Sequence, residues 1–153
     1  MITGFLPTPV NDMEDLHLEF TVVPDDFTRA GEVSGKVKKT LKDLGFPPLV
    51  VRRTAIAMYE AEINMVIHAN GGKITVTINP DVITVVFADS GPGIPDIGLA
   101  MQEGWSTASE EIRDMGFGAG MGLPNIKKSS DYMDVKTELG VGTTITIKIF
   151  TNP

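Results

Sequence analysis

The chain has 153 residues, of which 42% are hydrophobic and 22% charged, and its formal net charge is −7. These values predict one globular domain rather than a disordered chain. The acidic balance argues against direct nucleic-acid binding, which needs a basic surface. The absence of cysteine excludes disulfides, thiol catalysis and thiolate metal sites. No signal peptide and no run of ~20 apolar residues is present, so we expect a cytoplasmic protein without membrane contact.

The N-terminal residues predict an arm followed by a strand. Residues 1–15 contain glycine, proline and a group of acidic side chains, and we expect them to form a flexible arm ahead of a domain at residues 16–151. From His17 to Val22, hydrophobic and polar residues alternate. This period of two predicts a half-buried strand.

The next segment predicts an amphipathic helix. Apolar residues recur every three or four positions over residues 27–44, and Asp25 or Asp26 is the expected N-cap. Basic residues lie mostly off the apolar stripe, so we expect a solvated helix face rather than a binding patch. The stretch Gly31–Val37 looks like a phosphate-binding P-loop, but its spacing is short by one residue and Val37 replaces the magnesium-binding hydroxyl.

The remaining elements complete a mixed, mostly antiparallel sheet. A largely apolar helix is predicted over about residues 50–69, a hairpin over 74–88, a short helix over 125–130 and two strands over about 133–139 and 145–149. The nearly continuous apolar run at 82–88 predicts a central, heavily buried strand. The predicted fold class is therefore α+β, a two-layer sandwich with helices on one side of the sheet.

The long apolar helix carries several polar side chains, and burying them is costly unless they have partners. Glu60, Asn64 and His68 are four residues apart and share one stripe, whereas Glu62 lies about 200° away from Glu60. An amide oxygen can bind magnesium, and a carboxylate one turn away can accept a proton. A satisfied polar cluster is the alternative, and the stripe alone does not decide between them.

Two glycine-rich segments follow. Asp89, Gly91 and Gly93 stand directly after the most buried strand, where the carboxylate can accept a hydrogen bond from an exocyclic amine and the glycines admit a flat ring. A plain turn is the alternative. In residues 116–123, every second residue from Gly116 to Gly122 is glycine, and Leu123 follows. Such a loop ahead of a helix offers backbone N–H groups to phosphates.

Taken together, these segments resemble the ATP-binding fold that is shared by DNA gyrase, sensor histidine kinases and a mismatch-repair ATPase, the GHKL or Bergerat fold. Four segments carry the resemblance in the expected order: Glu60–Asn64, Asp89–Gly93, Gly116–Leu123 and Gly140–Thr143. The resemblance covers about residues 18–150. Within this superfamily, residues 91–97, 103–107 and 120–127 are most similar to anti-sigma-factor serine kinases, particularly the stressosome switch kinase.

The resemblance implies a role for each segment. It assigns Asn64 to Mg²⁺ and Glu60 to the base that acts on a partner serine. It places Asp89 at the adenine amine, Thr143 at the adenine edge, and Gly118, Gly120 and Gly122 at the phosphates. The other residues that it places in the nucleotide site are His68, Gly91, Gly93 and Leu123. Residues from about 96 to 115 would form a lid. Its segment 108–115 is more charged than the switch-kinase pattern, which leaves the role of Arg113 open.

Three functions compete. The first is a serine/threonine kinase that uses Mg-ATP to phosphorylate a small antagonist with a STAS-like domain. The second is an ATP-dependent binding module that holds a sigma factor, a phosphatase or another partner with little phosphotransfer. The third, an orphan histidine-kinase catalytic domain, is the least expected, because no helical hairpin with a phosphorylatable histidine is seen ahead of the fold. Homodimers are common in the resembled subgroup, so the resemblance also implies a possible homodimer.

Overall fold

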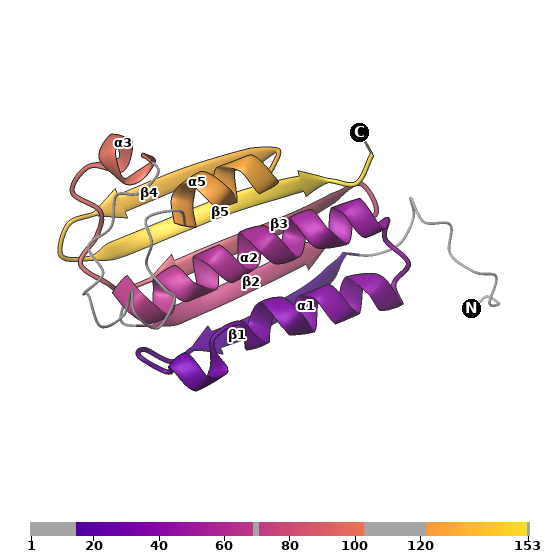
Figure 1. The fold of residues 1–153 in the computed structure, drawn as a ribbon, viewed down its shortest axis with the longest axis horizontal. Coiled ribbons are helices and arrows are strands. Elements are labelled where there is room, and N and C mark those ends of the chain that lie inside the picture. Colours follow the sequence, from indigo (N-terminus) through magenta and orange to yellow (C-terminus); the bar gives the residue numbers. More distant parts are fainter. Residues whose placement is uncertain (1–14, 69–70, 103–121, 153) are drawn as a thin grey trace.

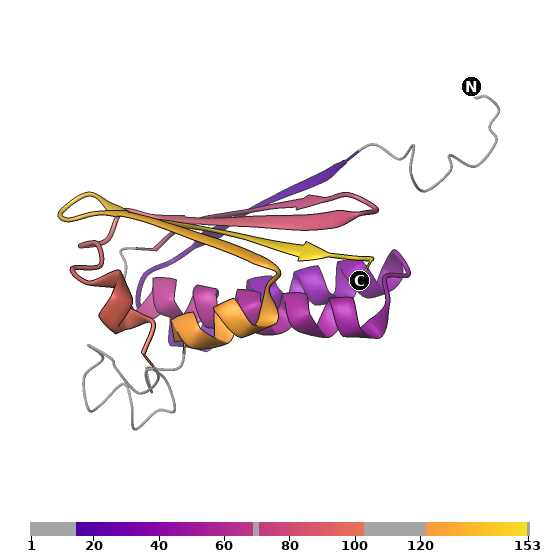
Figure 2. The ribbon, with the colours of Figure 1, turned by 90° about the horizontal axis from the view of Figure 1, so that it is seen from above.

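A computed structural model describes residues 15–68, 71–102 and 122–152. In this part of the chain, a five-stranded sheet carries its helices on one face, so that two layers are seen edge-on (Figures 1 and 2). The strand order is β1-β2-β3-β5-β4, and each neighbouring pair is antiparallel. The predicted α+β two-layer sandwich is therefore confirmed.

Along the chain, strands and helices come in groups: β1, then η2, α1 and α2, then β2 and β3, then α3 and α5, and finally β4 and β5. The strands are β1 (Leu16–Val22), β2 (Gly72–Ile78), β3 (Val82–Asp89), β4 (Tyr132–Glu138) and β5 (Gly142–Phe150). The helices are the 3₁₀ turn η2 (Phe27–Arg29), α1 (Glu32–Asp43), α2 (Pro48–His68), α3 (Ile97–Ala100) and α5 (Gly122–Ser129). Tight turns join β2 to β3 and β4 to β5, whereas β3 pairs with β5 across an intervening segment.

The core lies between the sheet and α2. Alternate residues of β3 are buried, and the register places Phe87 between Ile74 of β2 and Ile145 of β5. These side chains belong to one cluster with Met58 of α2. The prediction that residues 82–88 form a central strand is confirmed, although the described helices cover only one of its faces. On the other face, the side chains of β3 are half-buried.

The first helix begins later than predicted. Residues 27–29 form only a 3₁₀ turn, and α1 begins at Glu32 after Gly31. Gly31 has a φ of 92°, a left-handed conformation that favours glycine and breaks the expected continuous helix. Asp26 does not cap α1, because Gly31 occupies the N-cap position; the Asp26 carboxylate accepts a hydrogen bond from the Thr28 hydroxyl (2.8 Å).

A buried carboxylate from another helix caps α1. Glu62 of α2 exposes 3% of its surface. Its Oε2 accepts hydrogen bonds from the backbone N–H groups of Gly31 (3.0 Å) and Val33 (3.2 Å), and its Oε1 accepts one from Ser34 (3.0 Å). A negative charge at a helix N-terminus is stabilising, since the first N–H groups have no partner within the helix. Glu62 thereby joins α1 to α2.

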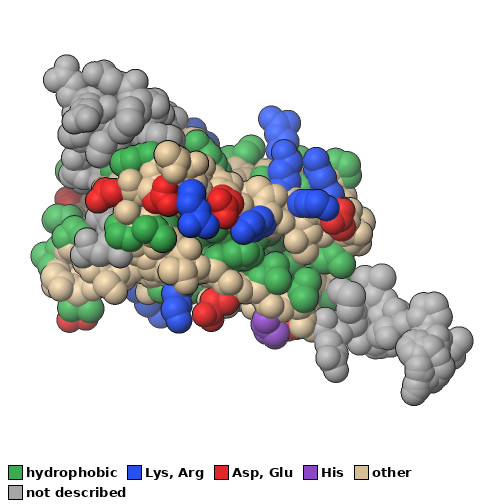
Figure 3. Space-filling model, turned by 90° about the horizontal axis from the view of Figure 1, so that it is seen from below, with side chains coloured by type: hydrophobic (Ala, Val, Ile, Leu, Met, Phe, Trp, Pro, Cys, Tyr) green, Lys and Arg blue, Asp and Glu red, His purple; other side chains and the backbone are tan. Residues whose placement is uncertain are grey.

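The outer face of α1 is solvated, as predicted. Its ion pairs connect Arg29 to Glu32 (3.2 Å), Lys36 to Glu32 (3.1 Å) and Lys39 to Asp43 (3.0 Å). Figure 3 shows acidic and basic side chains mixed along this edge of the molecule. Because acidic side chains pair with Arg29, Lys36 and Lys39, we interpret this surface as a solvated helix face rather than a binding patch.

The predicted arm and domain bounds remain predictions. Only Asp15 of residues 1–15 lies within the described residues, where its Oδ1 accepts a hydrogen bond from Asn79 Nδ2 (2.8 Å).

Candidate nucleotide site

The candidate site begins on the C-terminal half of α2. Glu60 and Asn64 are one helical turn apart on the same side of α2, as the sequence predicted, and both side chains are half-buried. His68 is the last residue of this helix, one turn further along the stripe. Its side chain lies outside the described residues, so its predicted nucleotide contact stays a prediction.

The N-terminus of α5 lies against Asn64. A Cβ added to Gly122, the first residue of α5, would lie 2.8 Å from Asn64 Nδ2 and 2.9 Å from Asn64 Oδ1. A side chain at this position would therefore push the amide away. The contact places the first helical turn, whose N–H groups have no partner within the helix, beside an amide oxygen that can bind a metal.

A second contact between α5 and α2 involves Asn125, which the sequence analysis did not single out. Asn125 Nδ2 donates a hydrogen bond to Glu60 Oε1 (3.4 Å). Burial raises the pKa of Glu60 above its ordinary value near 4.5, and the hydrogen bond from Asn125 partly opposes this shift. Asn125 follows Gly122 by three residues, so both lie on one helix face. That spacing was the available signal in the sequence.

The end of β3 contributes Asp89, whose two carboxylate oxygens have different surroundings. Oδ1 accepts hydrogen bonds from the backbone N–H groups of Gly91 (2.8 Å) and Thr143 (3.2 Å). Within the described residues, Oδ2 accepts no hydrogen bond. The carboxylate is thus held in a fixed orientation by one oxygen and can receive a ligand donor on the other.

The local backbone requires glycine at position 93, in addition to the predicted role of this residue at the nucleotide. Gly93 has a φ of 85°, and a Cβ there would lie 2.8 Å from the carbonyl oxygen of Glu138. Gly140 N–H donates to the carbonyl of Pro92 (2.9 Å). Residues 91–93 therefore pack closely on the turn between β4 and β5, while the predicted nucleotide contacts of Gly91 and Gly93 stay predictions.

A pair of threonines fixes the start of β5 beside Asp89. The hydroxyls of Thr143 and Thr137 are 2.9 Å apart, and Thr137 Oγ1 accepts a hydrogen bond from Ile94 N–H (2.8 Å). Thr143 is buried at 6% exposure. The sequence predicted Thr143 but not Thr137, because their pairing depends on the β4–β5 register.

The helix and strand parts of the site meet at Gly72. A Cβ on Gly72 would lie 2.8 Å from Met65 Cε and 3.0 Å from Asp89 Cα, so the last turns of α2 stand over the end of β3. The structure thereby gathers Glu60, Asn64, Asp89, Gly122 and Thr143 in one region. Leu123 is buried in α5 and belongs to the hydrophobic core.

The remaining predicted phosphate ligands, Gly118 and Gly120, lie outside the described residues. So do Arg113 and most of the predicted lid; its described beginning includes α3, whose first turn is capped by Asp96 (3.0 Å to Leu99 N–H). Among the residues that are described, no three His, Cys, Asp or Glu side chains could surround a metal ion. Mg²⁺ commonly takes few protein ligands and completes its coordination with phosphate oxygens and water. The Asn64 amide oxygen, beside the start of α5, fits this arrangement.

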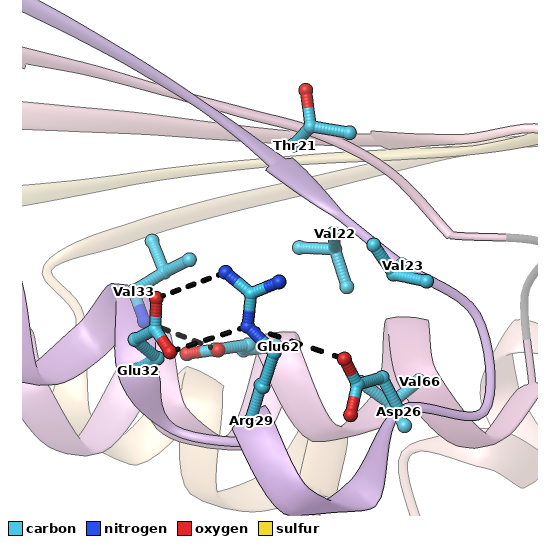
Figure 4. Close-up of a pocket in the computed structure, with 9 residues that line it drawn as sticks. All are labelled: Thr21, Val22, Val23, Asp26, Arg29, Glu32, Val33, Glu62 and Val66. Carbon is cyan, nitrogen blue, oxygen red and sulfur yellow. Dashed lines mark hydrogen bonds and ion pairs between the residues drawn. The ribbon is translucent and has the colours of Figure 1, made fainter.

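A separate pocket lies between β1, η2, α1 and α2 (Figure 4). Its lining includes Arg29, Glu32 and Glu62, and its cavity volume is about 40 Å³. A water needs roughly 10–15 Å³ of such volume, whereas small-molecule sites have roughly 300–1,000 Å³. This pocket can hold a few waters and is not the nucleotide site.

Comparison with known proteins agrees with this geometry. Residues 51–153 match the family described as "Histidine kinase-, DNA gyrase B-, and HSP90-like ATPase". The match covers most of the chain and includes Glu60, Asn64, Asp89, Gly122 and Thr143. The chain therefore belongs to this ATPase family, and the predicted superfamily is confirmed.

Two individual proteins of this family are similar in sequence to the chain. The chain is 31% identical over 112 residues to the serine/threonine-protein kinase RsbT of Bacillus subtilis, which covers 71% of this chain and 78% of that protein. It is 35% identical over 94 residues to the anti-sigma F factor of Thermoanaerobacter sp. (strain X514), covering 58% of this chain and 62% of that protein.

A solved structure supports the fold. The RsbU and RsbW domains of a Mycobacterium tuberculosis protein align with a TM-score of 0.59 over 93% of this chain and 34% of that one, at 15% identity. At this level of identity the comparison shows the fold alone. None of the helices in the described part of the chain is long and apolar enough to span a membrane.

Proposed function

We propose that this protein is a regulatory serine/threonine kinase that transfers the γ-phosphoryl group of Mg-ATP to a serine of a small antagonist protein with a STAS-like domain. The similarity to a relative named as a serine/threonine-protein kinase supports this function. The observation that carries the proposal is the position of Glu60 beside Asn64 and the N-terminus of α5.

In the proposed reaction, Glu60 accepts the proton of the attacking serine hydroxyl. Its half-buried position raises its pKa, which makes it a better proton acceptor once ionised. The hydrogen bond from Asn125 holds one carboxylate oxygen. The other oxygen is then available for the hydroxyl, in the manner of the catalytic carboxylate of other phosphoryl-transfer enzymes.

Asn64 and α5 would bind the triphosphate end of ATP. Bound Mg²⁺ would neutralise phosphate charge, with the Asn64 amide oxygen as its protein ligand. The N-terminal N–H groups of α5, beginning at Gly122, would add favourable contacts to phosphate oxygens. At the other end, Asp89 Oδ2 would accept the exocyclic amine of adenine, with Thr143 at the ring edge.

Substitution of the base tests this assignment. Purified wild type and Glu60→Gln are incubated with labelled ATP and a panel of purified STAS-domain proteins. We expect the wild type to phosphorylate at least one of them, and Glu60→Gln to be slower by roughly 10²–10⁴-fold with unchanged ATP affinity. Glu19→Gln is the matched control, because Glu19 is exposed on β1 away from the site.

The outcomes separate two functions. Equal phosphorylation by wild type and Glu60→Gln would remove Glu60 from the mechanism. Nucleotide-dependent capture of a partner without phosphorylation would favour an ATP-dependent binding module, a function in keeping with the relative named as an anti-sigma F factor.

A further inference from the structure

The outward side of α2 exposes large apolar side chains. Leu49 exposes 66% of its surface, Ile56 38% and Tyr59 41%. Helix α2 lies between α1 and α5 in the helix layer, and no other element of the described chain covers its outward side (Figure 1). We call Leu49, Arg52, Ile56 and Tyr59 the α2 stripe.

The core of the described chain does not include this side of α2, although one edge of the Tyr59 ring lies close to Gly31. The opposite side of α2 already buries Ala57, Met58, Ala61 and Met65 in the core. Single exposed apolar residues are common in proteins, but a contiguous group on one helix side is a feature of interaction surfaces.

The α2 stripe leads directly to the proposed base. Leu49 and Ile56 are seven residues apart, which is two helical turns, and Glu60 follows Ile56 by one turn on the same side. The stripe therefore extends roughly 16 Å along α2 and ends at Glu60. A macromolecule that reaches Glu60 along the outward side of α2 lies over Ile56, which is one turn away.

The charge of the stripe indicates the chemistry of the partner. Arg52 is exposed and lies three or four residues from both Leu49 and Ile56. The whole chain has a net charge of −7, so a cation at this position gives local attraction against a background that repels acidic proteins. The complementary surface is apolar, with a carboxylate at its rim.

We infer that the α2 stripe is the docking surface for the protein substrate, and that this substrate carries an apolar patch with an acidic rim beside its phosphoacceptor serine. The inference rests on the proposed kinase function, because it takes Glu60 as the group that the serine must reach. In this inference, the α2 stripe selects the partner protein, whereas the nucleotide site binds only ATP.

Steady-state kinetics test the inference with the STAS-domain protein that the wild type phosphorylates in the panel above. Leu49→Ser and Ile56→Ser should each raise the KM for this protein by roughly fivefold to tenfold, and Arg52→Gln should do the same with a weaker dependence on salt. The Kd for ATP should stay unchanged in all three. Phe150→Ser is the matched control, because Phe150 is 47% exposed on the far face of the sheet and should leave the KM unchanged.

The outcomes distinguish docking from chemistry. Unchanged KM values in the stripe variants would overturn the docking surface and leave the kinase function standing. A wild type that binds ATP but phosphorylates no member of the panel would overturn the proposed function and the docking inference together. Leu49→Ser guards against misfolding, since this side chain is already mostly in solvent.

Discussion

The carboxylate of Asp89 offers one oxygen to the protein and leaves the other for a ligand. Replacement by asparagine should separate these roles. The amide oxygen of the introduced side chain can still accept from the backbone N–H groups of Gly91 and Thr143, which places an NH₂ group where Oδ2 now stands. That group donates and cannot accept from the adenine amine.

We therefore expect Asp89→Asn to remain folded and to lose roughly tenfold to a hundredfold in ATP affinity. Binding of inosine triphosphate, which has a carbonyl in place of the amine, should weaken less. Isothermal titration with both nucleotides measures the ratio. An unchanged preference for ATP would contradict the placement of adenine at Asp89.

Asn125 is expected to set the ionisation of Glu60. The base must be ionised, so the phosphotransfer rate should fall as the pH drops through the pKa of Glu60, which burial raises. Asn125→Ala removes a donor that favours the carboxylate. The pKa should then rise further, and the acidic limb of the pH–rate profile should move to higher pH.

Carbon-13 NMR of the Glu60 carboxyl group checks this shift without a partner protein. Lys127→Ala is the control on the same helix, because Lys127 is exposed. A Glu60 titration that is identical in wild type and Asn125→Ala would show that the contact between the two side chains has no electrostatic effect.

At this scale the sequence predicted the residues that stand at fixed spacing within one element. Glu60 and Asn64 are one turn apart on α2, and Asp89 directly follows a buried strand. It did not predict Asn125 or Thr137, because each acts through a partner on another element. Their contacts arise only once α5 packs on α2 and β4 pairs with β5.

The connection between α1 and α2 depends on a single side chain. Glu62→Gln replaces one carboxylate oxygen by a donor that faces the N–H groups of Gly31, Val33 and Ser34. We expect this variant to lose roughly 2–4 kcal/mol of unfolding free energy, because hydrogen bonds to a buried charge are lost. Urea denaturation followed by circular dichroism measures the change.

Glu32→Gln provides the comparison, since Glu32 makes its ion pairs in solvent at the start of α1. Its denaturation midpoint should be nearly that of the wild type. If the two variants had the same midpoint, the capping role of Glu62 would be wrong.

Hydrophobic periodicity predicted most of the elements. Alternation located β1, β2 and β5, and the apolar run at residues 82–88 located the central strand. The start of α1 was predicted too early, because periodicity carries no information about a cap that comes from a residue about thirty positions away. Gly31 was the local signal for the break.

In the described part of the molecule, the strand order and the helix layer bring distant segments of the chain together. The antiparallel order β1-β2-β3-β5-β4 brings the end of β3 beside the start of β5, although more than fifty residues separate Asp89 from Thr143. Helices α2 and α5 lie on one side of the sheet, and α2 carries Glu60 and Asn64 to the region where β3 ends and β5 begins. The candidate nucleotide site and the α2 stripe therefore both involve the helix layer of the described chain.

The sequence anticipated this convergence through the order of four separated segments rather than through any one of them. It could not supply the distances between them, which depend on strand register and helix packing. The contributions of Gly118, Gly120 and the lid remain predictions, because these residues lie outside the described part of the chain.

Isothermal titration calorimetry with a slowly hydrolysed ATP analogue tests the central claim most directly. In the presence of Mg²⁺, the wild type should bind the analogue at one site, and Asn64→Ala and Asp89→Asn should each weaken that binding. No heat of binding to the wild type at millimolar nucleotide would contradict the account.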